Sequence, residues 1–310
     1  MELRLVGSEM CIRDRYGFSY QGMTQLYAAS AKPPALKTIC PAMIGYDLYT
    51  DWAYEGGAFC LITNLGWAVQ LATETARLRG NEKAYQELFQ ASRNIPLSTI
   101  NPALPKVISE YGKDSFYHQW IENYQSSEYW QNLSPNMENV DLPMLHIGGW
   151  FDTYLRGTIN LYKEMAGRSK FLQKLIVGPW SHIPWGRKVG ALNYGLQGSS
   201  SIDELQILWF NQFLKGINTG IFERSPVSLF EMGSNEWRNL NSWPSNSHKF
   251  YYLASKGLAN IREDSGSLTP SCPNISVDDT LVHDPWRPVP ALGGLSLIHI
   301  SEPTRRNSIA

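Results

Sequence analysis

Short apolar runs recur along the chain, and they are the first sign of regular structure. Leu142–Ile147 and Leu175–Val177 are apolar almost throughout and end in glycine, and Leu36–Cys40 is a third, less regular run. Runs of this length without polar alternation are typical of strands buried on both faces of a parallel sheet. We therefore expect three such strands, the first of them stopped by Pro41.

Helical periodicity occupies segments between and after these runs. Met23–Ala31 is rich in alanine, and Ile202–Leu214 carries its large apolar residues on one face, with Gly216 placed to end the helix. Strands that alternate with helices imply a parallel sheet flanked by helices. The pattern predicts an α/β fold whose core is formed by residues 16–57 and 140–222.

Two segments depart from this alternation. Residues 58–139 are helical and aromatic, with Leu65–Arg79 and Tyr85–Ser92 as the clearest helices, which predicts an inserted helical layer. Residues 223–294 contain short strand-like runs between clusters of Ser, Asn, Gly and Pro, which predicts the start of an all-β domain. Its strand-like runs are Val227–Met232 and Phe250–Leu253.

The two ends of the chain have an unusual character. Leu5–Arg15 and Leu295–Arg305 resemble translations, one from each strand, of the transposase adapter used to prepare DNA sequencing libraries. We therefore assign residues 1–15, and most of residues 295–310, to artefact and exclude them from fold reasoning. The expected natural sequence is Tyr16–Gly294, a fragment without its true ends.

Charge and composition exclude several classes of protein. The chain has 27 Lys and Arg residues against 28 Asp and Glu, so nothing in its charge favours nucleic acid or an anionic membrane as partner. Cys40, Cys60 and Cys272 lack the close spacing of a zinc site or disulfide framework. No phosphate-binding glycine loop or His-Glu-x-x-His motif occurs, so we expect neither a cofactor nor a metal.

The sequence predicts the protein's cellular location, partners and oligomeric state only in general terms. No apolar run approaches the roughly 20 residues needed to cross a bilayer. A cytoplasmic location is the default, although a signal peptide would lie in the part of the chain that the adapter-like sequence replaces. The expected partner is a small ester, amide or short peptide substrate, and self-association into a homo-oligomer is compatible with the sequence.

A candidate nucleophile lies in the glycine-flanked segment Gly17–Gly22, immediately before a predicted helix. A nucleophile elbow needs small residues around its serine because the backbone turns sharply from strand to helix there. Ser19 has glycines two residues before it and three residues after it, where the G-x-S-x-G motif has the second glycine two residues after. The alternative is that Ser19 caps the helix.

A candidate acid and base follow the two later strands. Asp152 comes just after Leu142–Ile147 and Gly148–Trp150, and His182 comes just after Leu175–Val177 and Gly178–Ser181. A carboxylate in this position can accept the imidazole N–H and fix its tautomer. The alternative for Asp152 is that it caps a helix over residues 153–165.

The order Ser, Asp, His along the chain is the order used by α/β hydrolases. The other histidines are less well placed. His118 lies among helical aromatics, His146 lies inside a buried strand, and His248 and His283 fall in the all-β part. Ser19, Asp152 and His182 are therefore the candidate catalytic triad.

At this point the chain resembles the X-prolyl dipeptidyl peptidase and cocaine esterase (CocE/NonD) family of serine hydrolases, and the matching segments occur in the family's order. These segments are Gly17–Gly22, Gly149–Asp152, Gly178–His182, Trp209–Gly216, Met232–Gly233, Glu236–Arg238, Asp284–Pro285, Pro288–Pro290 and Gly293–Gly294. The later glycine after the serine is the family's own pattern. The resemblance implies that Ser19 is the nucleophile, Asp152 the orienting acid and His182 the general base.

The resemblance also implies architecture and missing parts. It implies a helical cap over residues 58–139 and a C-terminal jelly-roll-like β-sandwich that is cut off before it ends. The backbone N–H of Tyr20 would donate one oxyanion hydrogen bond. The second donor, a tyrosine upstream, and the strand leading into Ser19 would be replaced by adapter-like residues. We therefore expect the parent to be a hydrolase and this chain to be inactive.

Substrate choice stays open at the level of sequence. Trp52, Tyr54, Trp150 and Tyr154 are candidate pocket walls, although aromatics near such motifs also build cores. A dipeptidyl peptidase needs carboxylates for a free amino terminus, and the nearby acids Glu55, Asp47 and Asp51 could serve. An esterase or acylase needs only an apolar acyl slot. A further alternative is a non-catalytic binding protein on a hydrolase scaffold.

Overall fold

The computed structural model describes most of the chain, and the fold is built from two compact units. The described residues are 13–97, 101–125, 127–244, 249–274 and 277–282. The boundary between the units lies between Ser242 and Trp243. The adapter-like segments lie largely outside the described residues. No helix in the described part of the chain is long and apolar enough to cross a membrane.

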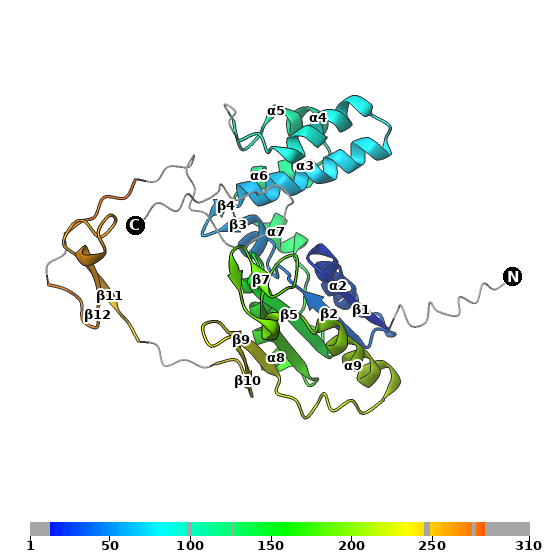
Figure 1. Ribbon diagram of the computed structural model, residues 1–310. Helices are drawn as coiled ribbons and strands as arrows, with labels where there is room; N and C mark the ends of the chain where they lie inside the picture. The colour runs from blue at the N-terminus through cyan, green and yellow to red at the C-terminus, as the bar shows by residue number, and fades with distance from the viewer. Residues whose placement is uncertain (1–12, 98–100, 126, 245–248, 275–276, 283–310) are drawn as a thin grey trace. The chain divides into compact units, whose positions relative to one another are not determined.

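The first unit is organised around a six-stranded sheet, in which neighbouring strands pair in the order β1-β2-β5-β6-β9-β10 (Figure 1). The first five strands run parallel, and β10 pairs antiparallel with β9. The strands are β1 (Asp14–Phe18), β2 (Thr38–Ala42), β5 (Met144–Phe151), β6 (Gln173–Ser181), β9 (Val227–Glu231) and β10 (Glu236–Leu240). The predicted α/β fold with a parallel sheet is confirmed.

Helices cover both faces of this sheet. Helices α2 (Tyr20–Ser30) and α8 (Leu155–Arg168) pack on the face that includes Ile39, while α9 (Ile202–Lys215) packs on the opposite face with Cys40. Successive strand residues point to opposite faces, so an apolar strand supplies both cores. The predicted helix stop at Gly216 is confirmed, because this glycine adopts the left-handed conformation at the end of α9.

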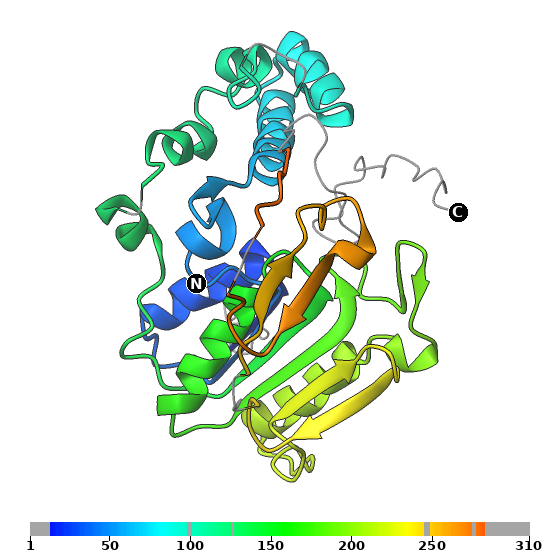
Figure 2. The same ribbon diagram turned by 90° about the vertical axis from the view of Figure 1, so that its left-hand side faces the viewer.

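A layer of helices is inserted between β2 and β5 and lies beyond one end of the sheet (Figures 1 and 2). Its helices are α3 (Leu61–Leu78), α4 (Glu82–Arg93), α5 (Lys106–Tyr111), α6 (Phe116–Glu122) and α7 (Glu128–Leu133). The first four pack on a core of their own, which includes Leu65, Leu88, Ile108 and Tyr117, whereas Trp130 of α7 belongs to the core that contains Ile39. Short strand pairs accompany the larger elements: β3 (Tyr54–Glu55), β4 (Ala58–Phe59), β7 (Lys188–Val189) and β8 (Leu192–Asn193).

Two expectations about the first strands are wrong. The strand leading into Ser19 is present, because Asp14–Phe18 forms β1 and pairs in parallel with β2, although its first two residues are adapter-like. Pro41 does not stop β2. The N–H groups of Ile39 and Met43 both donate to the β5 side, to Pro143 and Ile147, so Pro41 between them omits only one bond of the ladder.

The predicted start of a separate β domain at residue 223 is also wrong. Strand β9 pairs with β6, so residues 227–240 complete the sheet of the first unit. A short strand-like run such as Val227–Glu231, with only Val227 and Phe230 buried, reads the same in a parallel sheet and in a sandwich. The described part of the second unit contains an antiparallel pair, β11 (Tyr252–Ser255) and β12 (Gly266–Thr269). The jelly-roll-like sandwich stays a prediction.

Candidate active site

Ser19 lies at the sharp turn between β1 and α2. Its φ and ψ angles are 59° and −134°, a conformation that a residue with a side chain rarely adopts and that costs on the order of 1–3 kcal/mol. Its backbone N–H donates to the carbonyl of Ala42 at 2.9 Å, which ties the turn to β2. The Ser19 side chain makes no capping hydrogen bond, so the alternative role as a helix cap is not observed.

Two glycines allow this turn to form. A Cβ atom on Gly22 would lie 2.4 Å from Ile44 Cγ2 and 3.0 Å from the Ala42 carbonyl oxygen, so only glycine lets α2 approach β2 this closely. Gly17 has a φ of +144°, and a Cβ there would lie 3.0 Å from Cβ of Gln21. The predicted role of both glycines in relieving crowding around the turn is confirmed.

Gln25 holds the turn in place through two hydrogen bonds, a role that the sequence analysis did not predict. Its buried carboxamide Nε2 donates to the carbonyl of Gly17 at 3.0 Å, and its Oε1 accepts the N–H of Cys40 at 3.1 Å. One side chain of α2 thus bridges β1 and β2. A glutamine three residues after Gly22 would have been the available signal, because residues three apart share a helix face and Gly22 faces β2.

Asp152 and His182 meet at the ends of β5 and β6. His182 Nδ1 lies 2.7 Å from Asp152 Oδ1, and the two side chains are 4% and 0% exposed. Helix α8 begins at Leu155, so Asp152 does not cap it. With Asp152 accepting from Nδ1–H, the other ring nitrogen of His182 is left to accept a proton.

The His182 ring is enclosed by two aromatic rings. Phe18, the residue before Ser19, lies with its ring centroid 5.7 Å away, and Tyr154 lies 5.2 Å away, both edge to face. The contact with Phe18 brings the histidine loop to the serine turn. Burial raises the pKa of the Tyr154 hydroxyl well above its usual value, and the negative charge of Asp152 adds to the effect.

The four predicted pocket-wall residues separate into two groups. Tyr154 lies beside His182, and Trp52 packs against Tyr154 with ring centroids 4.6 Å apart. Trp150 instead donates its indole N–H to the carbonyl of Phe230 at 2.7 Å. Tyr54 donates its hydroxyl to the carbonyl of Trp120 at 2.7 Å, inside the aromatic core. Through these hydrogen bonds, Trp150 joins β5 to β9 and Tyr54 joins β3 to α6.

A further aromatic pair links the serine turn to the inserted helices. The ring of Tyr20, which is half exposed, lies 5.9 Å from that of Trp67 on α3. The sequence analysis missed Trp67. Its place in the first turns of the predicted helical layer was visible, but only the fold brings that turn to the nucleophile.

The three acids proposed for amino-terminus recognition have other partners. Arg156 donates to the buried Asp51 at 2.9 Å and to the exposed Glu55 at 3.2 Å. Asp47 accepts the backbone N–H groups of Tyr49 and Thr50. Glu55, with a side chain 74% exposed, and Asp47 are both exposed, whereas Asp51 is buried.

The other histidines occupy different environments, as expected. His118 Nε2 lies 3.1 Å from the carbonyl of Gly112. His146 is fully buried, its Nε2 lies 3.0 Å from Gln173 Oε1, and burial lowers its pKa to about 4. His248 and His283, like the motif residues after Val282, lie outside the described residues. No described group of three or more His, Cys, Asp or Glu side chains could hold a metal ion.

Comparison with known proteins identifies relatives of this chain. The chain is 28% identical to cocaine esterase from Rhodococcus sp. (strain MB1 Bresler) over 307 residues, covering 92% of this chain and 52% of that protein. It thus spans about half the length of the curated relatives it matches.

Two solved structures have the same fold. An aminopeptidase from a marine sediment Thaumarchaeota archaeon has a TM-score of 0.62 at 23% identity, with 89% of this chain and 45% of that chain covered. An α-amino acid ester hydrolase has a TM-score of 0.54 at 22% identity, with 79% and 42% covered. Residues 15–184 match the family described as X-Pro dipeptidyl-peptidase (S15 family), and the chain belongs to that family of α/β hydrolases.

Proposed function

We propose that the whole protein is a serine hydrolase that cleaves ester or amide bonds through an acyl-enzyme. The observation that carries the proposal is the 2.7 Å contact between buried Asp152 and His182 beside the strained turn at Ser19. A buried carboxylate that fixes a histidine next to a serine on a strained turn is the arrangement that activates a serine hydroxyl.

The proposed reaction has two halves. In the first, Ser19 Oγ attacks the carbonyl carbon of the substrate while His182 takes the hydroxyl proton, and His182 then returns that proton to the leaving group. In the second, water attacks the acyl-enzyme by the same route. Asp152 stabilises the imidazolium in both halves. The backbone N–H of Tyr20 donates to the oxyanion, a type of contact worth roughly 2.7–4 kcal/mol.

The acyl group of the substrate would lie among aromatic side chains. Tyr154 is next to His182 and Trp52 lies against Tyr154, while Trp67 is next to Tyr20, so aromatic rings accompany both the proposed base and the turn of the proposed nucleophile. We retain Trp52 and Tyr154 from the predicted pocket walls and add Trp67. Tyr54 and Trp150 would support the pocket from behind through their hydrogen bonds.

The choice between esterase and dipeptidyl peptidase depends on the acids. A free amino terminus needs an accessible carboxylate, and Asp51 is already paired with Arg156. Glu55 and Asp47 are exposed and remain candidates, and Glu55 also pairs with Arg156. The relatives include proteins named as an esterase, an aminopeptidase and an amino acid ester hydrolase, so both substrate classes belong in the test.

The test combines labelling with hydrolysis. The longer parent protein and its Ser19→Ala variant are treated with a fluorophosphonate and assayed on acyl esters and on Xaa-Pro anilides with free and blocked amino termini. Labelling and cleavage by the parent that depend on Ser19 are the expected result. Absence of both from the parent would overturn the proposal and favour a binding protein on a hydrolase scaffold. The 310-residue chain is treated with the fluorophosphonate beside the parent, and absence of labelling is the result expected of a chain that is inactive alone.

A further inference from the structure

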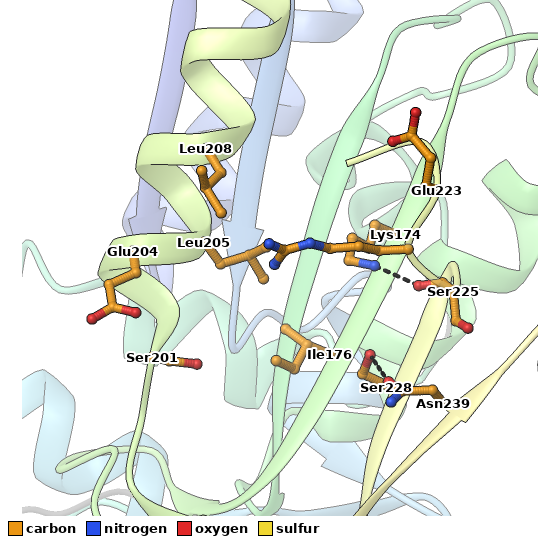
Figure 3. Close-up of a pocket in the computed structure, with 11 residues that line it drawn as sticks. Lys174, Ile176, Ser201, Glu204, Leu205, Leu208, Glu223, Ser225, Ser228 and Asn239 are labelled. Carbon is orange, nitrogen blue, oxygen red and sulfur yellow. Dashed lines mark hydrogen bonds between the residues drawn. The ribbon is translucent and has the colours of Figure 1, made fainter. Parts of the chain in front are cut away.

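A second cavity lies far from the proposed active site. It opens between α9 and the strands β6, β9 and β10 and has a volume of about 540 Å³ (Figure 3). Lys174, near the start of β6, lies in its wall, whereas His182 follows the opposite end of that strand. Eight residues of extended strand separate the two by roughly 25 Å. The cavity is therefore independent of the triad.

The cavity contains two cations without an acidic partner. Lys174 is only 4% exposed, and its amine donates to the backbone carbonyl of Ser225. Arg224 lines the same cavity. Burial, and next the charge of Arg224, lower the pKa of Lys174 to about 8. Among the residues that the structure describes, no carboxylate forms an ion pair with either side chain.

A buried cation whose charge is uncompensated is costly, and an anion that reaches it removes that cost. A further donor is present on β10. Asn239 Oδ1 accepts the hydroxyl of Ser228 at 2.8 Å, so the amide nitrogen of Asn239 is left to donate elsewhere. The cavity thus offers an ammonium, a guanidinium and an amide to one ligand.

The rest of the lining restricts the ligand. Ile176, Leu205 and Leu208 give the cavity an apolar wall. Glu204 and Glu223 also line it, and Figure 3 shows their carboxylates turned away from Lys174. Two cations and two acids make the lining formally neutral, which favours an anion with one charge over a phosphate dianion.

We propose that this cavity binds a small organic monocarboxylate, with its carboxylate between Lys174 and Arg224 and its apolar part against Ile176, Leu205 and Leu208. The site needs no catalysis by Ser19 and stands independently of the proposed function. The carboxylate replaces water around Lys174 and keeps the ammonium protonated.

Titration calorimetry with hexanoate on the full chain tests the proposal. We expect saturable binding at pH 8 accompanied by proton uptake, seen as a dependence of the measured enthalpy on the buffer, because the anion raises the pKa of Lys174. Lys174→Met should abolish both. Arg224→Gln changes an exposed side chain, keeps the lysine, and should weaken binding by about tenfold.

Controls separate this site from other sources of heat. Hexanol lacks the carboxylate and should not bind, whereas equal binding of hexanol would overturn the proposal. Hexanoate binding that survives both substitutions would place the ligand elsewhere, including at the triad, and would also overturn it. Inorganic phosphate that binds more tightly than hexanoate would contradict the assignment of a monocarboxylate.

Discussion

The strained backbone of Ser19 persists because neighbouring residues fix it from several directions. The N–H of Ser19 donates a hydrogen bond to the carbonyl of Ala42, and the carbonyl of Gly17 accepts one from the side chain of Gln25. Strain of this kind survives only where the surrounding structure determines it. The proposed nucleophile is therefore positioned by residues that never touch a substrate.

Replacing Gln25 by methionine tests this positioning. Methionine has a similar shape but cannot bond to Gly17 or Cys40, so the turn should loosen. We expect about a tenfold slower reaction of Ser19 with a fluorophosphonate and a lower kcat for ester hydrolysis, with KM nearly unchanged. Gln25→Glu keeps the acceptor for Cys40 but loses the donor to Gly17 and buries a charge, so it should not restore the rate. An unchanged labelling rate in a folded Gln25→Met variant would contradict the idea.

Asp152→Asn tests the acid. The asparagine amide would donate to His182 Nδ1 and impose the wrong tautomer, so kcat of the parent should fall by up to roughly 10⁴-fold. Steady-state kinetics on an acyl ester measure this change. Asp203→Asn, on the exposed first turn of α9, is the matched control and should leave kcat unchanged. Equal effects of the two substitutions would argue against the triad.

At the scale of elements, the close contact between α2 and β2 decides where Ser19 lies. Gly22 is the point of contact, because the nearest atoms of β2 and Ile44 leave no room for a side chain. Packing of this kind is sensitive to a single added methyl group.

We expect Gly22→Ala to destabilise the protein by about 1–3 kcal/mol, because its Cβ would collide with Ile44. Gly167, inside α8, has no atom within 4 Å of an added Cβ. Gly167→Ala should therefore stabilise the protein by about 0.5–1 kcal/mol. Denaturant unfolding of the two variants measures both signs, and a loss of stability in Gly167→Ala would contradict this account of packing.

Local sequence predicted some elements better than others. Ile202–Leu214 was placed within one residue because its apolar stripe and terminal glycine agree. The end of β2 was misplaced because the effect of Pro41 depends on which neighbouring strand its nitrogen faces. Ser19, Asp152 and His182 could be proposed as the triad because each directly follows a strand or its glycine turn, and their catalytic roles stay a prediction. Trp67 and the pair of Arg156 with Asp51 were missed because their partners are distant in sequence. Gln25 was missed although its partners Gly17 and Cys40 are near in sequence, because only the close packing of α2 on β1 and β2 turns its side chain into a bridge.

At the scale of the whole molecule, buried His146 makes stability depend on pH. Its pKa is about 4 in the folded protein and close to 6.5 in the unfolded chain. The unfolded state therefore binds the proton more readily, and stability is lost as the pH falls from about 6.5 to 4. The difference corresponds to about 3 kcal/mol.

The His146→Asn variant should lose this part of the pH dependence. We expect the difference in free energy of unfolding between the original protein and the variant to decrease by about 3 kcal/mol when the pH is lowered from 7 to 4. Denaturant titrations at several pH values measure the gap. Carboxylates titrate in both proteins, so they largely cancel in the difference. A gap that stays constant with pH would show that His146 does not titrate in this way.

The bond from Trp150 to Phe230 has a consequence for the order of folding. Trp150 immediately precedes the segment that carries Asp152, and its partner lies 80 residues later, on β9. Contacts of such long sequence separation form late, because a large loop must close first. During synthesis, the hydrogen bond that closes this loop can form only after the ribosome has released the chain beyond residue 240. The proposed acid would thus reach its final position only after most of the sheet has assembled.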